Sequence, residues 1–275
     1  MASDTETPVL SGLYRYPIKS TAGQALQRGI VTEEGLEGDR RYMVVKPDGT
    51  FITARTHPHL QRVVAQPISA GLALGHERLG EIIADETDFA GASFATGVWG
   101  DAFEALTTTA ALDAWFSEVV GEPARLLWLG QRSPRYRERI ARRVSFADGY
   151  PLMLISQASL DDLNTRTPTL QRMAQFRPNL VIAGTAPYAE DTWKRIRIGE
   201  LEFSVDAPCS RCAMITVDPA LGTFQARGEP LRTLAGYRRG EGGKVYFGQN
   251  LIAHGGGEIE LGAPLSVLET RAETH

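Results

Sequence analysis

Residues 206–222 read DAPCSRCAMITVDPALG and contain both cysteines of the chain. Cys209 and Cys212 enclose Ser210 and Arg211, and residues 201–205 before them alternate between apolar and polar side chains. Such alternation predicts a strand, so we expect the cysteine pair on a loop that leaves this strand. A thiolate beside a guanidinium and a hydroxyl can hold a metal on one side and an anion on the other.

Four interpretations of the cysteine pair are open. A structural zinc site needs two further Cys or His ligands, but there are no other cysteines and the five histidines are scattered. A thioredoxin-like dithiol needs a helix after the motif, whereas Met214–Val217 reads as another strand. Two small buried residues would also fit. We favour one thiolate on a soft, redox-active metal that brings non-protein ligands with it.

Short strands punctuated by Gly and Pro dominate the rest of the chain. Residues 10–18 form one such run, and the segments 42–46 and 51–54 flank a Pro-Asp-Gly turn. The turn at Gly199 predicts a hairpin between residues 196 and 205. Thr109 and Gly121 delimit a helix over residues 110–120, and Ser156 caps a second one. The density of strands predicts a sheet that is closed or curled on itself.

Polar residues at strand ends and turns could surround an anion bound near the cysteines. Taken singly, each is more often a surface residue or a structural partner, but each stands beside Pro or Gly, where loops carry sites. Arg offers a planar fork for phosphate, and Lys a point charge. The turn 148–150 is either a further part of this site or only a turn. The candidates are Lys19, Ser20, Arg40, Arg177, Asn179, Ser210, Arg211, Gln249 and Asn250.

Composition excludes several classes of function. The 275 residues carry a net charge of −4, which gives no footprint for nucleic acid or an anionic membrane. No apolar run approaches the roughly 20 residues of a membrane helix, and the N-terminus lacks a secretory signal, so a cytoplasmic protein is expected. The arginine-rich residues 131–143 read as a mobile surface loop. There is no phosphate loop and no dinucleotide fingerprint.

Eight segments, taken together and in this order, resemble the MOSC family of molybdenum-cofactor proteins with its N-terminal β-barrel domain. Within that family the sequence is most similar to bacterial relatives of the mitochondrial amidoxime-reducing component. No single segment is specific, but the combination is. The segments are Tyr16-Pro-Ile-Lys-Ser20, Gly38-Asp-Arg40, Ser145-Phe-Ala-Asp-Gly-Tyr-Pro151, Phe176-Arg-Pro-Asn179, Cys209-Ser-Arg-Cys212, Thr216-Val-Asp-Pro219, Gly228-Glu-Pro-Leu231 and Phe247-Gly-Gln-Asn250.

The resemblance implies a β-rich α+β fold, with an N-terminal β-barrel-like domain over residues 6–122 and a MOSC-type β-barrel domain with short helices over residues 123–270. Residues 271–275 are expected to be a disordered tail. The implied cofactor is Mo-molybdopterin, held between the domains, with Cys212 as the metal ligand. The implied cofactor-binding residues are Lys19, Ser20, Arg40, Gly149, Tyr150, Arg177, Asn179, Ser210, Arg211, Gln249 and Asn250.

The implied reaction is the two-electron reduction of N–O bonds in small N-hydroxylated substrates, with Asp148 as a candidate proton relay. No cysteine follows Cys212, so we expect no iron–sulfur cluster in this chain and a separate reductase or ferredoxin as electron donor. Two other functions remain open. One is a carrier or sulfur-transfer module for the cofactor, and the other is a metal-free β-rich binding protein.

Overall fold

The computed structural model describes residues 7–271. It is rich in strands, and its largest sheet has eight of them, all antiparallel to their neighbours except β14 and β15. Their order is β2 (Gln24–Ala25), β1 (Val9–Arg15), β15 (Leu180–Ala183), β14 (Leu152–Ser156), β20 (Val245–His254), β17 (Leu201–Arg211), β16 (Trp193–Ile198) and β22 (Leu265–Thr270).

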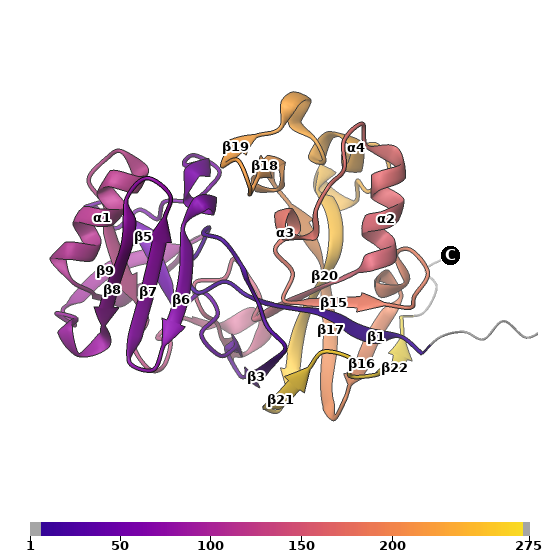
Figure 1. Cartoon of the computed structure of the whole chain (residues 1–275). Coiled ribbons are helices and arrows are strands. Elements are labelled where there is room, and N and C mark those ends of the chain that lie inside the picture. Colours follow the sequence, from indigo (N-terminus) through magenta and orange to yellow (C-terminus); the bar gives the residue numbers. More distant parts are fainter. Residues whose placement is uncertain (1–6, 272–275) are drawn as a thin grey trace, which may run out of the picture.

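The start of the chain is built into this C-terminal sheet. β1 pairs with β15, with Leu13 opposite Leu180, so the two strands lie side by side in Figure 1. Nearby, β3 (Arg28–Thr32) pairs with β21 (Gly257–Glu260) and with β4 (Gly35–Leu36). The strand predicted over residues 10–18 therefore exists, with a partner that no local pattern identifies. The predicted domain boundaries, 6–122 and 123–270, stay a prediction.

Residues 42–128 form a second lobe with two smaller sheets, called the N-terminal lobe below (Figure 1). The large sheet and its helices form the other lobe. Helix α1 (Ala110–Val120) is confirmed with its predicted ends, because the Thr109 side chain accepts the Leu112 N–H and Gly121 adopts φ +75°. The predicted strand 51–54 makes only one bridge, between Phe51 and Val45. The sheets are β5 (Tyr42–Val45), β11 (Arg125–Trp128), β10 (Asp101–Thr107) and β9 (Ser93–Val98), and β6 (Val64–Ile68), β7 (Gly71–His76) and β8 (Gly80–Asp85).

Three short α-helices lie beside the large sheet (Figure 1). The first is α2, whose predicted cap is confirmed because the Ser156 side chain accepts the Ser159 N–H. The apolar sides of these helices and of the sheet share a core that includes Ile155, Leu163 and Phe247. The helices are α2 (Gln157–Arg166), α3 (Met173–Phe176) and α4 (Leu231–Ala235). Over residues 7–271 no helix is long and apolar enough to cross a membrane.

Three local predictions differ from the structure. Residues 131–143 are not a loose surface loop but a small hairpin of β12 (Tyr136–Arg137) and β13 (Arg142–Arg143), next to which Arg135 is 1% exposed. The predicted strand 214–217 is mainly a 3-10 turn, η5 (Ala213–Thr216). Of the predicted disordered tail, only Arg271 is described. Its N–H donates to the Thr192 carbonyl, and residues 272–275 lie outside the described part.

Candidate functional site

A cavity of about 580 Å³ is lined by residues from both lobes, and every predicted site residue except Gln249 lines it. The N-terminal part of the chain contributes Lys19, Ser20 and Arg40, together with Thr53, Arg55 and Trp99. The C-terminal sheet and its loops contribute the remaining walls. Their predicted members are Asp148, Gly149, Tyr150, Arg177, Asn179, Ser210, Arg211, Cys212 and Asn250.

The cysteine motif lies at the end of β17 rather than wholly on a loop. The strand runs to Arg211, and Cys212 follows it directly. The pairing with β20 shifts register between Pro208 and Ser210, close to Gly248, which adopts φ +81°. A Cβ at Gly248 would lie 2.6 Å from the Cγ1 atom of Ile155, so only glycine fits here. Both thiols are free, and Cys212 is exposed in the cavity wall.

Arg211 faces the sulfur atoms. Its Nη1 lies 3.0 Å from Cys209 Sγ and 3.2 Å from Met153 Sδ, and its Nη2 donates to the Phe176 carbonyl at 2.6 Å. Cys209 is thus occupied by Arg211, whereas no hydrogen bond to Cys212 Sγ is present among residues 7–271. The geometry leaves Cys212 as the thiol available to a metal.

Lys19 and Asp148 form an ion pair at the cavity wall. The Lys19 Nζ atom lies 2.5 Å from Asp148 Oδ1 and also donates to the Phe146 carbonyl at 2.7 Å. Burial lowers the pKa of Lys19, and Asp148 offsets this only in part. Burial raises the pKa of Asp148, but the charge of Lys19 and the hydrogen bonds from Lys19 and Trp99 lower it more, below its ordinary range. Asp148 is therefore a carboxylate at neutral pH.

Two arginines stack on Tyr16. The guanidinium carbons of Arg40 and Arg177 each lie 4.2 Å from the centre of its ring. Arg40 is held by Asp39 at 2.6 Å and by the Arg177 carbonyl at 3.2 Å. Burial, followed by the repulsion of Arg40, lowers the pKa of Arg177 to about 10. Two cations are thus fixed close together, and the Asp39 carboxylate that compensates them contacts Arg40 rather than Arg177.

The other predicted residues have plain structural partners. Asn179 is buried and joins the N-terminal segment of the chain to the C-terminal sheet, since its Oδ1 accepts from Arg40 and its Nδ2 donates to the Tyr14 carbonyl. The hydroxyl of Tyr150 donates to Asp206, and burial followed by Asp206 raises the pKa of Tyr150 to about 12. Asn250 Nδ2 donates to the Pro208 carbonyl at 3.3 Å.

Gln249 is the one predicted site residue that the structure places elsewhere. It is fully buried, and its Nε2 donates to Asp191 Oδ1 at 2.6 Å, outside the lining of the cavity. Successive side chains of a strand point to opposite faces, so Gln249 and Asn250 cannot both face the cavity. The geometry gives the predicted cofactor role of Gln249 no support.

Unpartnered polar atoms and unusual backbone angles gather at the cavity. Ser20 Oγ, Arg177 Nη2 and Arg211 Nε are buried without a hydrogen-bond partner. Ser20, Arg40, Trp99 and Arg177 have φ between +46° and +71°, a region that non-glycine residues rarely adopt. Buried donors without partners and strained backbone are both costly, and they concentrate where a ligand is bound.

Two family models match most of the described chain. Residues 7–123 match the MOSC N-terminal beta barrel domain, and residues 141–266 match the MOSC domain. The chain is 31% identical to the human protein named mitochondrial amidoxime-reducing component 1, over 93% of this chain and 82% of that protein. The chain belongs to the MOSC family.

Another relative in this family has a different name. The chain is 32% identical to the rice protein (Oryza sativa subsp. japonica) named molybdenum cofactor sulfurase, over 87% of this chain but only 32% of that protein. Among solved structures, the YUAD protein of Bacillus subtilis aligns over 94% of each chain, at 10% identity and a TM-score of 0.43. The names of the two sequence relatives differ in activity, and only that of the sulfurase mentions the molybdenum cofactor.

Several residues of the MOSC pocket were not predicted. Thr53, Arg55, Trp99, Arg137 and Lys244 also line the cavity. Three of these come from the N-terminal lobe, where each stands in a turn without a chemical motif. The only signal available in the sequence is the large aromatic Trp99 directly before Gly100, a position where a turn would normally carry a polar residue.

The pocket is strongly basic. Seven of its lining residues are Lys or Arg, whereas Asp148 is the only acidic one, although the whole chain has a net charge of −4. Over residues 7–271 no group of three His, Cys, Asp or Glu side chains is placed to hold a metal ion. A metal at Cys212 would therefore take most of its ligands from an anionic group bound in this pocket.

Proposed function

We propose that this MOSC protein binds Mo-molybdopterin and reduces N-hydroxylated compounds such as amidoximes, hydroxylamines and N-hydroxylated bases. One observation carries the proposal. An exposed, unoccupied thiol, Cys212, faces a basic cavity in which buried donors of Ser20, Arg177 and Arg211 have no partner. The name of the human relative supports the choice of substrates.

The residues of the cavity fit this cofactor. A volume of about 580 Å³ lies within the usual range for a small-molecule site. The guanidinium of Arg177 and the hydroxyl of Ser20 offer donors to a phosphate or a pterin, and Arg211 offers a further N–H close to the cysteines. The residues that would complete the site are Lys19, Arg40, Gly149, Tyr150, Asn179, Ser210 and Asn250.

When bound, the molybdenum centre supplies a two-electron reduction, in which R–NH–OH, two electrons and two protons give R–NH2 and water. Cys212 would be its protein ligand. Asp148 has a lowered pKa and holds no proton of its own at neutral pH, so it could only relay a proton that it receives from another group. Lys19, hydrogen-bonded to Asp148, is the protonated group beside it. The relay role of Asp148 fails if Asp148→Asn keeps full turnover with an unchanged pH profile.

The electrons would come from a separate electron-transfer protein. A second function, transfer of the cofactor or of its sulfur without turnover, is favoured by the sulfurase relatives. The two functions differ in one assay. A reductase reduces benzamidoxime with an artificial electron donor, whereas a carrier shows no turnover even when it is loaded with cofactor.

The decisive experiment measures molybdenum and pterin in protein purified from a host that makes molybdopterin. We expect near-stoichiometric metal in the wild type, loss of metal in Cys212→Ala, and retention of most metal in Cys209→Ala, the matched control two residues inside the strand. A well-folded wild type without metal and pterin would overturn the proposed function.

A further inference from the structure

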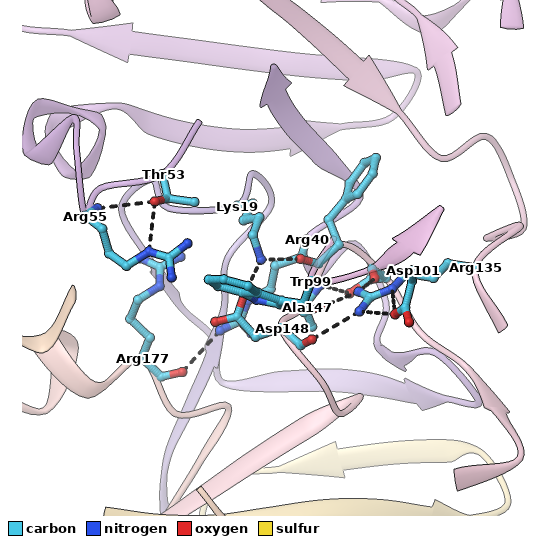
Figure 2. Close-up of polar contacts among 12 residues, drawn as sticks. Lys19, Arg40, Thr53, Arg55, Trp99, Asp101, Arg135, Ala147, Asp148 and Arg177 are labelled. Atoms are coloured by element: carbon cyan, nitrogen blue, oxygen red, sulfur yellow. Dashed lines mark hydrogen bonds and ion pairs between the residues drawn. The ribbon is translucent and has the colours of Figure 1, made fainter. Parts of the chain in front are cut away.

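The tip of the hairpin of β9 and β10, called the turn 99–101 below, comprises the two turn residues Trp99 and Gly100 and the first residue of β10, Asp101. Trp99 lines the pocket (Figure 2). Trp99 lies at its start, is 49% exposed, and has φ +52°. The two-residue turn between the paired residues Val98 and Asp101 requires positive φ at both of its positions, where Asn and Gly are usual, so a large aromatic residue is unfavourable here. An aromatic residue with this unfavourable backbone conformation at the wall of a pocket indicates a functional role for its side chain.

Three contacts fix the indole of Trp99. The Arg55 guanidinium lies 4.1 Å from the indole, and the Phe51 ring meets it edge-on at 5.3 Å between centroids. The indole Nε1 donates to Asp148 Oδ1 at 2.9 Å, the same oxygen that accepts from Lys19 (Figure 2). The side chain of Asp148 is therefore held by one residue of the turn.

A second residue of the same turn holds the main chain of Asp148 through Arg135. Asp101 Oδ2 lies 2.8 Å from Arg135 Nε and 2.7 Å from its Nη2. Arg135 Nη2 donates to the Asp148 carbonyl at 3.1 Å, and its Nη1 donates to the Ala147 carbonyl (Figure 2). The same Nη1 also donates to the Ser145 carbonyl. Arg135 is 1% exposed, so this fork of hydrogen bonds is shielded from water.

We propose that the turn 99–101 is a positioning element that fixes Asp148 in the pocket, by its carboxylate through Trp99 and by its backbone through Asp101 and Arg135. The positioning is a property of the cofactor-free chain. Its effect on turnover rests on the proposed function. Since Asp148 belongs to the C-terminal half and the turn to the other lobe, the contact also couples the two lobes at the pocket.

The first test uses the indole N–H signals of the cofactor-free protein in a ¹H–¹⁵N spectrum. The sequence has four tryptophans, and single Trp→Phe variants assign their signals. We expect Asp148→Asn to move the Trp99 signal and to leave that of Trp115, whose Nε1 is buried without a partner, in place. Asp101→Asn should move both the Trp99 indole signal and the Asp148 amide signal. A Trp99 signal unaffected by Asp148→Asn would overturn the proposal.

The second test compares benzamidoxime turnover by Trp99→Phe and by the control Trp115→Phe. Loss of one hydrogen bond to a carboxylate predicts a fall in kcat of about tenfold for Trp99→Phe, with a displaced pH profile. Trp115→Phe should match the wild type. The positioning role would be overturned if Trp99→Phe kept the kcat and the pH profile of the wild type while Asp148→Asn was impaired. Absence of turnover in all proteins would instead count against the proposed function, and the spectra would still decide whether the turn holds Asp148.

Discussion

Replacement of Arg177 by methionine tests whether the basic pocket is built for a ligand or for stability. Arg177 is 7% exposed, and its pKa is lowered to about 10, first by burial and then by Arg40. A pKa lowered to this value means that the charge costs on the order of 3 kcal/mol in the cofactor-free protein. The hydrogen bond to the Thr21 carbonyl and the stacking on Tyr16 return about 2.5–5 kcal/mol.

These terms nearly cancel, so Arg177→Met should change the free energy of unfolding by less than about 2 kcal/mol in urea titrations. Breaking a satisfied buried ion pair would cost about 3–5 kcal/mol. The change in ligand binding should be larger. Inorganic phosphate at about 100 times its dissociation constant would stabilise the wild type by about 2.7 kcal/mol, and Arg177→Met should lose most of this gain.

The matched control is Arg15→Met. Arg15 lies outside the pocket, and all three of its nitrogens are hydrogen-bonded, to Gln24 and to the Glu37 carbonyl. This variant should lose stability yet keep the full response of Tm to phosphate. A loss of more than about 3 kcal/mol in Arg177→Met, or an undiminished phosphate response, would refute the reasoning that Arg177 is held for a ligand.

Three further outcomes are expected. Because the folded-state pKa of Asp148 is lowered, its carboxylate stabilises the folded protein fully above about pH 4, and this contribution is lost as the pH falls further. The difference in free energy of unfolding between wild type and Asp148→Asn should therefore narrow below about pH 4 in urea titrations. Burial raises the pKa of Glu190 in the folded state above its ordinary value of about 4.5. The free energy of unfolding of the wild type should therefore fall as the pH rises from about 4.5 through this raised pKa. Glu190→Gln should lack this fall, whereas Glu190→Ala, which leaves Ser159 without its acceptor, should cost about 1–3 kcal/mol. Gln249→Ala should lower the free energy of unfolding by about 1 kcal/mol through the lost hydrogen bond to Asp191, and should leave the molybdenum content unchanged. Loss of the metal in this variant would show that Gln249 does belong to the cofactor site.

Local signals predicted the elements of this fold well. Thr109, Gly121 and Ser156 mark helix ends because their side chain or backbone completes hydrogen bonds within one turn. The hairpin around Gly199 follows from alternation on both sides of a two-residue turn, and Ile198 indeed pairs with Leu201. These features depend on residues close in sequence, so the sequence alone is enough to place them.

The predicted site residues were found by motif, and the missed ones act over long distances in the chain. In the sequence Arg135 is one of many arginines of a polar segment. Its hydrogen-bond acceptors, the carbonyls of Ala147 and Asp148, belong to a turn that follows its own hairpin, and no local pattern links the two. Trp99 belongs to no chemical motif, and its partner Asp148 lies 49 residues away. The choice between Gln249 and Asn250 was within reach of the sequence, since the period of a strand allows only one of them to face the pocket.

The path of the chain explains why both halves are needed for one pocket. β1 is paired into the C-terminal sheet and is followed by Lys19 and Ser20, and β2 then returns to the same sheet before the chain builds the N-terminal lobe. Lys19 is thereby anchored near the sheet while its charge meets Asp148, and the turn at Trp99 returns from the far lobe to the same carboxylate. The strained and unpartnered groups of the pocket are kept in place by two independently packed cores, and this lets the protein hold them ready for a ligand in its absence.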